Sequence, residues 1–357
     1  MQIKKKNIIS GRNIVFLYAQ LTPYFLGCIN NYSDANPNNK ILIIYLNSFK
    51  NLKSNSNNNC QIIHKDKFKS REEIKNFIKK LNPAVLLVSG RMDSEYLYVA
   101  RYFINKTIRV TLQDTMYQKT FKQLIQSIFS KYLYRQYFDK FWGVGTSQTD
   151  FAKRIGFNQS EISEGFYVAD KIFFDNKITY EYNNIKKLKF LFIGRLAKEK
   201  NIIKLAKAIE SINILNKCSH QLTVIGEGKK LSQLLSFNCV DYQGFKSQKE
   251  IIEIARECHA FCLPSIYEPW GVVVHEMAAL GLPILSSNKC GSSYNLVIDN
   301  FNGFKFNPYN LQSIIQSLNN FILLDNKEKK KFSINSNLIA QEINHNNWNN
   351  ILNSFLI

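Results

Sequence analysis

The sequence predicts an α/β protein with two doubly wound parallel sheets. Strand-like segments alternate with helical segments in both halves of the chain, a pattern typical of parallel sheets covered by helices. At 357 residues the chain exceeds one ordinary core, and its 45% hydrophobic content can fill two. Its seven cysteines are odd in number and lack C-x2-C spacing. We therefore expect no bound metal, no disulfide framework and a reducing, cytoplasmic location.

The amino-terminal half contains five strand-like segments. They are Asn13–Gln20, Ile41–Asn47, Cys60–His64, Pro83–Ser89 and Ile108–Leu112. Glu72–Leu81 has the apolar spacing of a helix, and the polar stretch Phe174–Lys187 is the candidate linker to the second half.

The second half opens with Lys189–Leu196, a buried-type strand that breaks at Gly194. The following helix has an apolar stripe formed by Ile202, Leu205, Ala206, Ile209 and Ile212. Arg195 comes just beyond the glycine, at the carboxyl end of a strand, where open α/β sheets bind ligands. An exposed strand-end cation without function is the alternative for Arg195. Two more strands are predicted at Gln221–Gly228 and Val240–Phe245.

Two carboxylates seven residues apart mark the next segment. Ala260–Ser265 is strand-like, and the Pro269-Trp270-Gly271 turn opens a helix whose first amides form an anion site; those amides belong to Gly271, Val272 and Val273. Glu268 and Glu276 can face one pocket, where carboxylates suit the hydroxyls of a sugar or ribose. His275 has apolar helix neighbours, so we expect a packed histidine.

Taken in order, these motifs resemble the retaining glycosyltransferases of the GT-B fold, family 4 (glycosyl transferases group 1), over roughly residues 188–308. Glu268–Glu276 corresponds to the family's E-x7-E signature. The resemblance implies two Rossmann-like domains facing across a cleft, an acceptor-side domain at 1–175 and a nucleotide-sugar-binding domain at 176–337. A helix at about 338–357, around Trp348, is expected to pack back on the first domain.

The resemblance also implies an activity and roles for residues. A hexose or hexosamine would move with retention from a nucleotide diphosphate sugar to a glycan or lipid-linked glycan, as in bacterial surface polysaccharide synthesis, without metal or cofactor. Arg195 and Lys200 would hold the diphosphate beside Gly194, Glu268 the sugar hydroxyls and Glu276 the ribose. Phe245 and Lys246 would lie beside the base.

The amino-terminal half departs from the family pattern. Many relatives have a glycine pair after the first strand, where this chain has Gln20–Gly27, and a His-Asp pair where it has Gln113-Asp114. Asp114 could orient the sugar or acceptor. Asp93 and Asp114 are equally well explained as helix N-caps, and His64 follows a different strand. These departures leave open a catalytically inactive, nucleotide-sugar-binding partner subunit. A glycan phosphorylase is disfavoured, because no lysine motif for pyridoxal phosphate is recognisable.

The net charge of +20 is uneven: residues 1–175 carry +13 and residues 176–357 carry +7. A basic acceptor half favours an anionic membrane surface or a phosphorylated lipid-linked glycan, and no nucleic-acid-binding motif is present. Phe121–Phe138 has an apolar stripe at helical spacing, with Lys122, Lys131 and Arg135 around it. We expect this helix to pack in a core; the alternative is docking on the cytoplasmic leaflet, with no apolar run long enough to span it.

Overall fold

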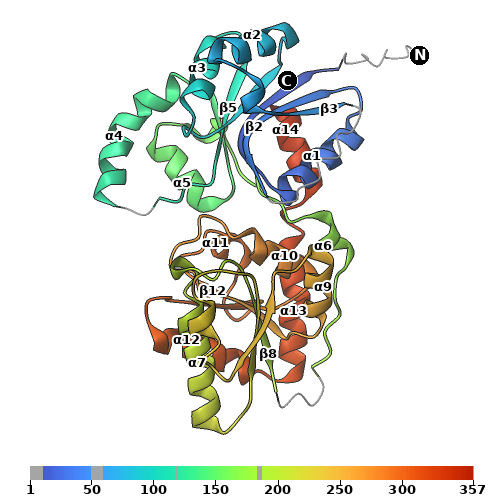
Figure 1. The fold of residues 1–357 in the computed structure, drawn as a ribbon, viewed down its shortest axis with the longest axis vertical. Coiled ribbons are helices and arrows are strands. Elements are labelled where there is room, and N and C mark those ends of the chain that lie inside the picture. The colour runs from blue at the N-terminus through green and yellow to red at the C-terminus, as the bar shows by residue number, and fades with distance from the viewer. Residues whose placement is uncertain (1–10, 50–58, 118–119, 183–186, 357) are drawn as a thin grey trace, which may run out of the picture. The chain divides into compact units, whose positions relative to one another are not determined.

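The computed structural model describes residues 11–49, 59–117, 120–182 and 187–356. The chain divides into two compact units (Figure 1). Unit 1 comprises Met1–Val144, Gln148–Phe166 and His345–Ile357, and unit 2 comprises Gly145–Ser147 and Tyr167–Asn344. Both units are α/β, with a parallel sheet in each, as the alternation of strands and helices predicts.

Unit 1 is built on a parallel sheet with strand order β3-β2-β1-β4-β5-β6-β7 among the described residues. The strands are β1 (Asn13–Leu21), β2 (Lys40–Ser48), β3 (Cys60–His64), β4 (Val85–Ser89), β5 (Ile108–Gln113), β6 (Lys140–Gly143) and β7 (Ile162–Ser163). The five predicted strands are confirmed to within about two residues at each end.

The helices that cover this sheet include the predicted one at Glu72–Leu81. They are α1 (Pro23–Ala35), α2 (Arg71–Leu81), α3 (Ser94–Tyr102), α4 (Phe121–Arg135), α5 (Thr146–Arg154) and α14 (His345–Ser354). Thr22 caps α1 and Ser70 caps α2, each by accepting a hydrogen bond from a backbone N–H of the first turn. In the described residues, no helix of the protein is long and apolar enough to cross a bilayer.

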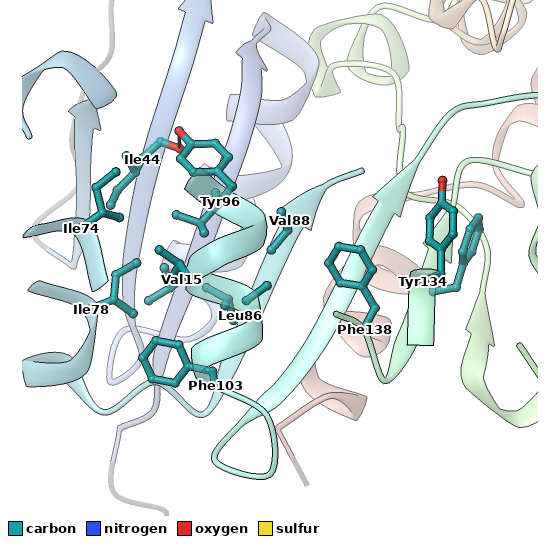
Figure 2. Close-up of a cluster of buried hydrophobic side chains, with 14 of the residues drawn as sticks. Val15, Ile44, Ile74, Ile78, Leu86, Val88, Tyr96, Phe103, Tyr134 and Phe138 are labelled. Atoms are coloured by element: carbon teal, nitrogen blue, oxygen red, sulfur yellow. Dashed lines mark hydrogen bonds between the residues drawn. The ribbon is translucent and has the colours of Figure 1, made fainter. Parts of the chain in front are cut away.

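One hydrophobic cluster of unit 1 lies between the sheet and helices α2 and α3 and continues to α4 and α5 (Figure 2). Val15, Leu86 and Val88 project from the central strands and are fully buried or nearly so. Tyr96 is buried beside them, and its hydroxyl donates to the Ile44 carbonyl oxygen at 3.0 Å. Parallel strands buried on both faces are expected to be continuously apolar, as β1 and β4 are.

The carboxyl-terminal helix α14 belongs to unit 1, where it packs beside α1 (Figure 1). Trp348 is buried, its indole N–H donates to the Phe166 carbonyl oxygen at 3.0 Å, and its ring lies 5.0 Å from that of Trp142. Tyr32 of α1 donates from its hydroxyl to Asn353 at 2.7 Å. Residues more than 300 positions apart in the sequence therefore pack together in one hydrophobic core of unit 1.

Unit 2 is built on a second parallel sheet, with order β10-β9-β8-β11-β12-β13. The strands are β8 (Lys189–Ile193), β9 (Gln221–Ile225), β10 (Val240–Gly244), β11 (Ala260–Leu263), β12 (Ile284–Ser287) and β13 (Gly303–Phe306). The helices are α6 (Lys171–Asp175), α7 (Ile202–Asn216), α8 (Leu231–Leu234), α9 (Gln248–Arg256), α10 (Val272–Leu280), α11 (Ser293–Leu296), α12 (Leu311–Ile322) and α13 (Asn326–Ala340). The stripe predicted for α7 is buried throughout.

The segment predicted as a linker, Phe174–Lys187, packs on unit 2 instead. The Ile178 N–H donates to the Leu280 carbonyl oxygen at 2.9 Å, and the hydroxyls of Tyr180 and Tyr182 donate to carbonyls of unit 2 at 2.8 and 3.0 Å. The three side chains are buried. Residues 183–186 lie outside the described part. Polar composition suggested a linker because the apolar residues here are spaced between polar ones.

The expectation that the Phe121–Phe138 stripe packs in a core is wrong for α4. Phe121 is 79% exposed, Ile128 64% and Tyr132 79%, whereas Tyr134 and Phe138, at the end of the segment, are buried. The spacing predicts an apolar face but not what covers it. The side chains of Lys122 and Lys131 lie outside the described residues.

Candidate functional site

The strand order of unit 2 contains a point at which the winding direction reverses. From β8 the chain moves outward to β9 and β10, and then returns to place β11 on the other side of β8. Open α/β sheets bind ligands at such a switch point, outside the carboxyl ends of the strands. The segments that leave β8 and β11 there are Gly194–Lys200 and Pro264–Gly271.

Two glycine turns meet at the end of β8. The Gly194 N–H donates to the Ile225 carbonyl oxygen at 3.0 Å, and Gly226 follows with φ of +131°. A Cβ atom at position 226 would lie 2.0 Å from the Gly194 carbonyl oxygen. Glycine is therefore required at 226, and the Gly194 turn is held by backbone contact.

The two predicted diphosphate-binding cations leave this turn in different environments. Arg195 is 75% exposed and its guanidinium lies 3.0 Å from the Glu199 carboxylate. Lys200 is only 14% exposed and forms an ion pair with Glu268, which is equally buried and also accepts from the Ser265 hydroxyl at 3.3 Å. The fold thus brings together Lys200 and Glu268, which are 68 residues apart in sequence.

Helix α10 begins at Val272, four residues after Glu268. Gly271 is its N-cap, with φ of +86°, and supplies no capping side chain, so the first amides, including those of Val272 and Val273, have no intrahelical acceptor. A Cβ atom at position 271 would stand 3.0 Å from both Glu268 Cγ and Cys290 Sγ. Such a helix start suits an anion, and the anion site predicted for these amides stays a prediction.

Glu276 lies in the second turn of α10 and is partly buried. Loss of hydration, together with the negative charge of Asp170, raises the pKa of its carboxyl to about 8. At neutral pH the group is therefore largely protonated, and can both donate and accept a hydrogen bond. The neighbouring His275 is buried, accepts from the Ala169 N–H at Nδ1 and contacts the Ala340 carbonyl oxygen at Nε2, which confirms the packed histidine.

The residues predicted beside the base follow β10. Phe245 is 73% exposed, and Lys246 lies 3.7 Å from the Glu250 carboxylate of α9. A cavity of about 550 Å³ adjoins Lys246 and is lined by residues of α6, β10 and α9. Of the predicted donor-site residues, all of which the structure describes, Lys246 alone lines this cavity. Ile172 and Asn176 from the α6 region also line it. The sequence offered no signal for either residue, and Asn176 lies in the segment predicted as a linker.

The remaining sequence candidates belong to unit 1. Asp114 directly follows β5, and its carbonyl oxygen accepts from the Gln148 side chain at 2.8 Å. Asp93 is the N-cap of α3, accepting from the amides of Glu95 and Tyr96, as its structural interpretation predicts. His64 contacts the Leu46 carbonyl oxygen at 2.9 Å. The role of Asp114 toward a sugar or acceptor stays a prediction.

In the described part of the chain, no group of three or more His, Cys, Asp or Glu side chains is arranged so that it could hold a metal ion.

Comparison with known proteins gives the unit 2 site a context. Residues 176–338 match the family described as glycosyl transferases group 1. An uncharacterised glycosyltransferase of Methanocaldococcus jannaschii is 28% identical over 131 residues, covering 35% of this chain and 33% of the relative. The amylovoran biosynthesis glycosyltransferase AmsK of Erwinia amylovora is 34% identical over 119 residues, covering 29% of this chain and 28% of the relative. The aligned stretches thus span about a third or less of these curated relatives.

Solved structures show the fold over the whole chain. Anabaena HepE, crystallised with UDP and glucose, superposes with a TM-score of 0.74 and 15% identity, over 97% of this chain and 99% of HepE. The protein therefore has the two Rossmann-like units of the GT-B glycosyltransferases, as the sequence predicts.

Proposed function

We propose that the protein is a retaining glycosyltransferase of family 4 that transfers a hexose or hexosamine from a nucleotide diphosphate sugar to an acceptor hydroxyl. The observation that carries the proposal is the convergence of Lys200 and Glu268 at the switch point of unit 2, between the Arg195 turn and the open start of α10. The match of residues 176–338 to glycosyl transferases group 1 supports it.

The charges of this site suit a departing nucleoside diphosphate. As the bond from the anomeric carbon to the diphosphate oxygen breaks, negative charge grows on that oxygen, and fixed cations and amides stabilise it. Arg195, Lys200 and the amides of Gly271, Val272 and Val273 would supply this stabilisation without a metal ion. The diphosphate would compete with Glu268 for the Lys200 ammonium group, which frees the Glu268 carboxylate to accept from sugar hydroxyls.

The other side chains would orient the donor. Protonated Glu276 can donate to one ribose hydroxyl and accept from the other, and exposed Phe245 offers a ring face to the base beside Lys246. We propose retention, as in the enzymes that the motifs resemble. The new bond forms on the face that the diphosphate leaves, and a diphosphate oxygen accepts the proton of the acceptor hydroxyl.

For the acceptor we propose a glycan or lipid-linked glycan in bacterial surface polysaccharide synthesis, with the protein in the cytoplasm or at the inner face of the membrane. The name of the relative AmsK, an amylovoran biosynthesis glycosyltransferase, supports this choice. HepE with bound UDP and glucose makes UDP-glucose the first donor to test.

A thermal-shift screen against nucleotide sugars tests the donor site. A ligand at about 100 times its Kd adds about 2.7 kcal/mol of apparent stability. We expect the shift to shrink in Lys200→Ala and to persist in Lys198→Ala, an exposed lysine of the same turn. Binding of a nucleotide sugar without transfer to any glycan acceptor would favour the inactive partner subunit. If no nucleotide sugar shifts the melting temperature, the proposed function is wrong.

A further inference from the structure

Helix α4 presents an apolar face that the rest of unit 1 does not cover. Its large apolar residues recur at positions i, i+3, i+4, i+7, i+8, i+11 and i+12, which places them on one side of the helix. The exposed members are Phe121 (79%), Leu124 (47%), Ile125 (43%), Ile128 (64%), Phe129 (63%), Tyr132 (79%) and Leu133 (39%). None of the described side chains from Phe121 to Leu133 is buried.

This face is a local concentration. Among the described residues of unit 1, the other exposed large hydrophobic side chains are Phe49 and Met92, which lie on separate segments. In unit 2 the exposed apolar side chains are spread over several elements. Scattered exposed apolar residues are normal, whereas a contiguous patch marks an interaction surface.

Unit 1 holds α4 firmly at its carboxyl end. Tyr134 and Phe138 are buried in the core (Figure 2), and the Arg91 guanidinium lies 5.0 Å from the Tyr134 ring centroid. Arg135 donates to the Glu161 carboxylate at 2.7 Å. The first three turns therefore extend an apolar face from an anchored carboxyl end.

Charge selects the partner. Residues 115–138 contain four cationic residues, at positions 119, 122, 131 and 135, and no Asp or Glu. Arg135 is already paired with Glu161, so the three lysines carry the charge argument. Arg154 of α5 adds a further cation, its guanidinium lying 4.3 Å from the Tyr117 ring centroid. Two copies of this face would bring like charges together, which opposes self-association. The apolar and cationic face of α4 is instead complementary to a surface that combines negative charge with an apolar interior.

We propose that the exposed face of α4 docks the protein on an anionic lipid bilayer. A helix with aromatic and aliphatic residues on one face and cations around it lies in the plane of the interface, with its apolar face in the headgroup and acyl boundary. Anionic headgroups attract the surrounding cations. The proposal goes beyond the sugar transfer proposed above and does not depend on it.

Vesicle sedimentation of the full chain tests the docking. We expect binding to vesicles with about 30 mol% phosphatidylserine on the order of ten times that to phosphatidylcholine alone, falling as salt rises. The double variant Ile128→Gln/Phe129→Gln should reduce binding about tenfold or more, because it places polar groups where the acyl boundary would be. The matched control Ile214→Gln/Leu215→Gln changes two residues of α7 that are 74% and 77% exposed, and should bind like the parent protein.

Three outcomes would overturn the proposal: equal binding to neutral and anionic vesicles, equal loss of binding in both double variants, or no vesicle binding. Light scattering then identifies the alternative, since a dimer abolished by the α4 variant would mean that the face joins two copies. The nucleotide-sugar thermal shift, measured on the same samples, separates this result from the donor site. Normal donor binding without vesicle binding rejects the docking alone, and the reverse rejects the donor site alone.

Discussion

Helices α4 and α7 are both 15 residues long and both have an apolar stripe at helical spacing, but they end in opposite environments. In α7 the stripe from Ile202 to Ile212 is buried against the unit 2 sheet and α12, whereas in α4 the stripe is exposed from Phe121 to Leu133. The pattern in the sequence fixes which face is apolar. Whether protein covers that face depends on where the fold places the helix.

Truncating one apolar residue in each helix should give the largest difference between α4 and α7, measured as the change in the free energy of unfolding. Ile209→Ala in α7 removes a fully buried side chain and should lower the free energy of unfolding by about 2–5 kcal/mol. Ile128→Ala in α4 removes a side chain that is 64% exposed and should change it by less than about 0.5 kcal/mol. Urea denaturation measures both. A similar loss in the two variants would show that α4 is covered in solution.

The position of α7 also links it to the proposed site, because it begins two residues after Lys200. Arg195→Ala and Lys200→Ala should each slow sugar transfer by on the order of 100-fold, about 3 kcal/mol, through loss of leaving-group stabilisation. Ile128→Gln on α4 should leave transfer to a soluble acceptor unchanged. Steady-state kinetics with the cognate donor are the measurement. Full activity in both cation variants would remove Arg195 and Lys200 from the mechanism.

A smaller effect is expected at Glu276. Its pKa is raised in the folded state, so the native protein binds more protons than the unfolded chain, and this group's contribution to stability falls as pH rises from about 4.5 to about 8. Glu276→Gln mimics the protonated form. Because Glu276 is only partly buried, solvent screens much of this effect, and at pH 8 the substitution should raise the Tm by about 2–4 °C, or about 1 kcal/mol. The gain should shrink toward pH 5. A gain independent of pH would contradict the assigned protonation.

The smallest expected difference between α4 and α7 is in the local unfolding of their helical turns. Amides in the first three turns of α4 should exchange with solvent faster than those of α7, because few buried side chains hold those turns closed. Anionic vesicles should slow exchange in α4 and leave α7 unchanged. Hydrogen exchange read by mass spectrometry checks both statements. Equal protection of the two helices without lipid would mean that α4 is stabilised by contacts other than burial.

Local patterns predicted the two sheets well, and the roles assigned to the unit 2 site residues stay predictions. Gly194, Gly226 and Gly271 punctuate strand ends, and the turns they form place Lys200 and Glu268 at one edge of the sheet. The ion pair between those two side chains could not be predicted, since it depends on the neighbouring order of β8 and β11. The raised pKa of Glu276 depends likewise on tertiary structure, through burial and through Asp170, which lies 106 positions earlier in the sequence.

Packing between segments that are distant in the sequence was harder to predict, for the same physical reason. In unit 1, Trp348 completes a core begun at Tyr32. The family resemblance implied that the helix around Trp348 joins this unit, whereas no local pattern reveals which core such a helix will join. The packing of Tyr180 and Tyr182 on unit 2 was missed because a polar segment with two tyrosines has no helical or strand period. The exposure of the α4 stripe could not be predicted either, because it depends on whether another part of the protein packs against that face of the helix.

The discontinuity of unit 1 has a consequence for biosynthesis. Its sheet is made early, but α14, whose Trp348 and Asn353 contact Trp142 and Tyr32, follows all of unit 2 in the chain. Domains generally fold as they emerge from the ribosome. The hydrophobic core around Trp142 in the nascent unit 1 therefore stays incomplete while unit 2 is translated and folds. During that interval the first-made half is the one that most needs protection by chaperones.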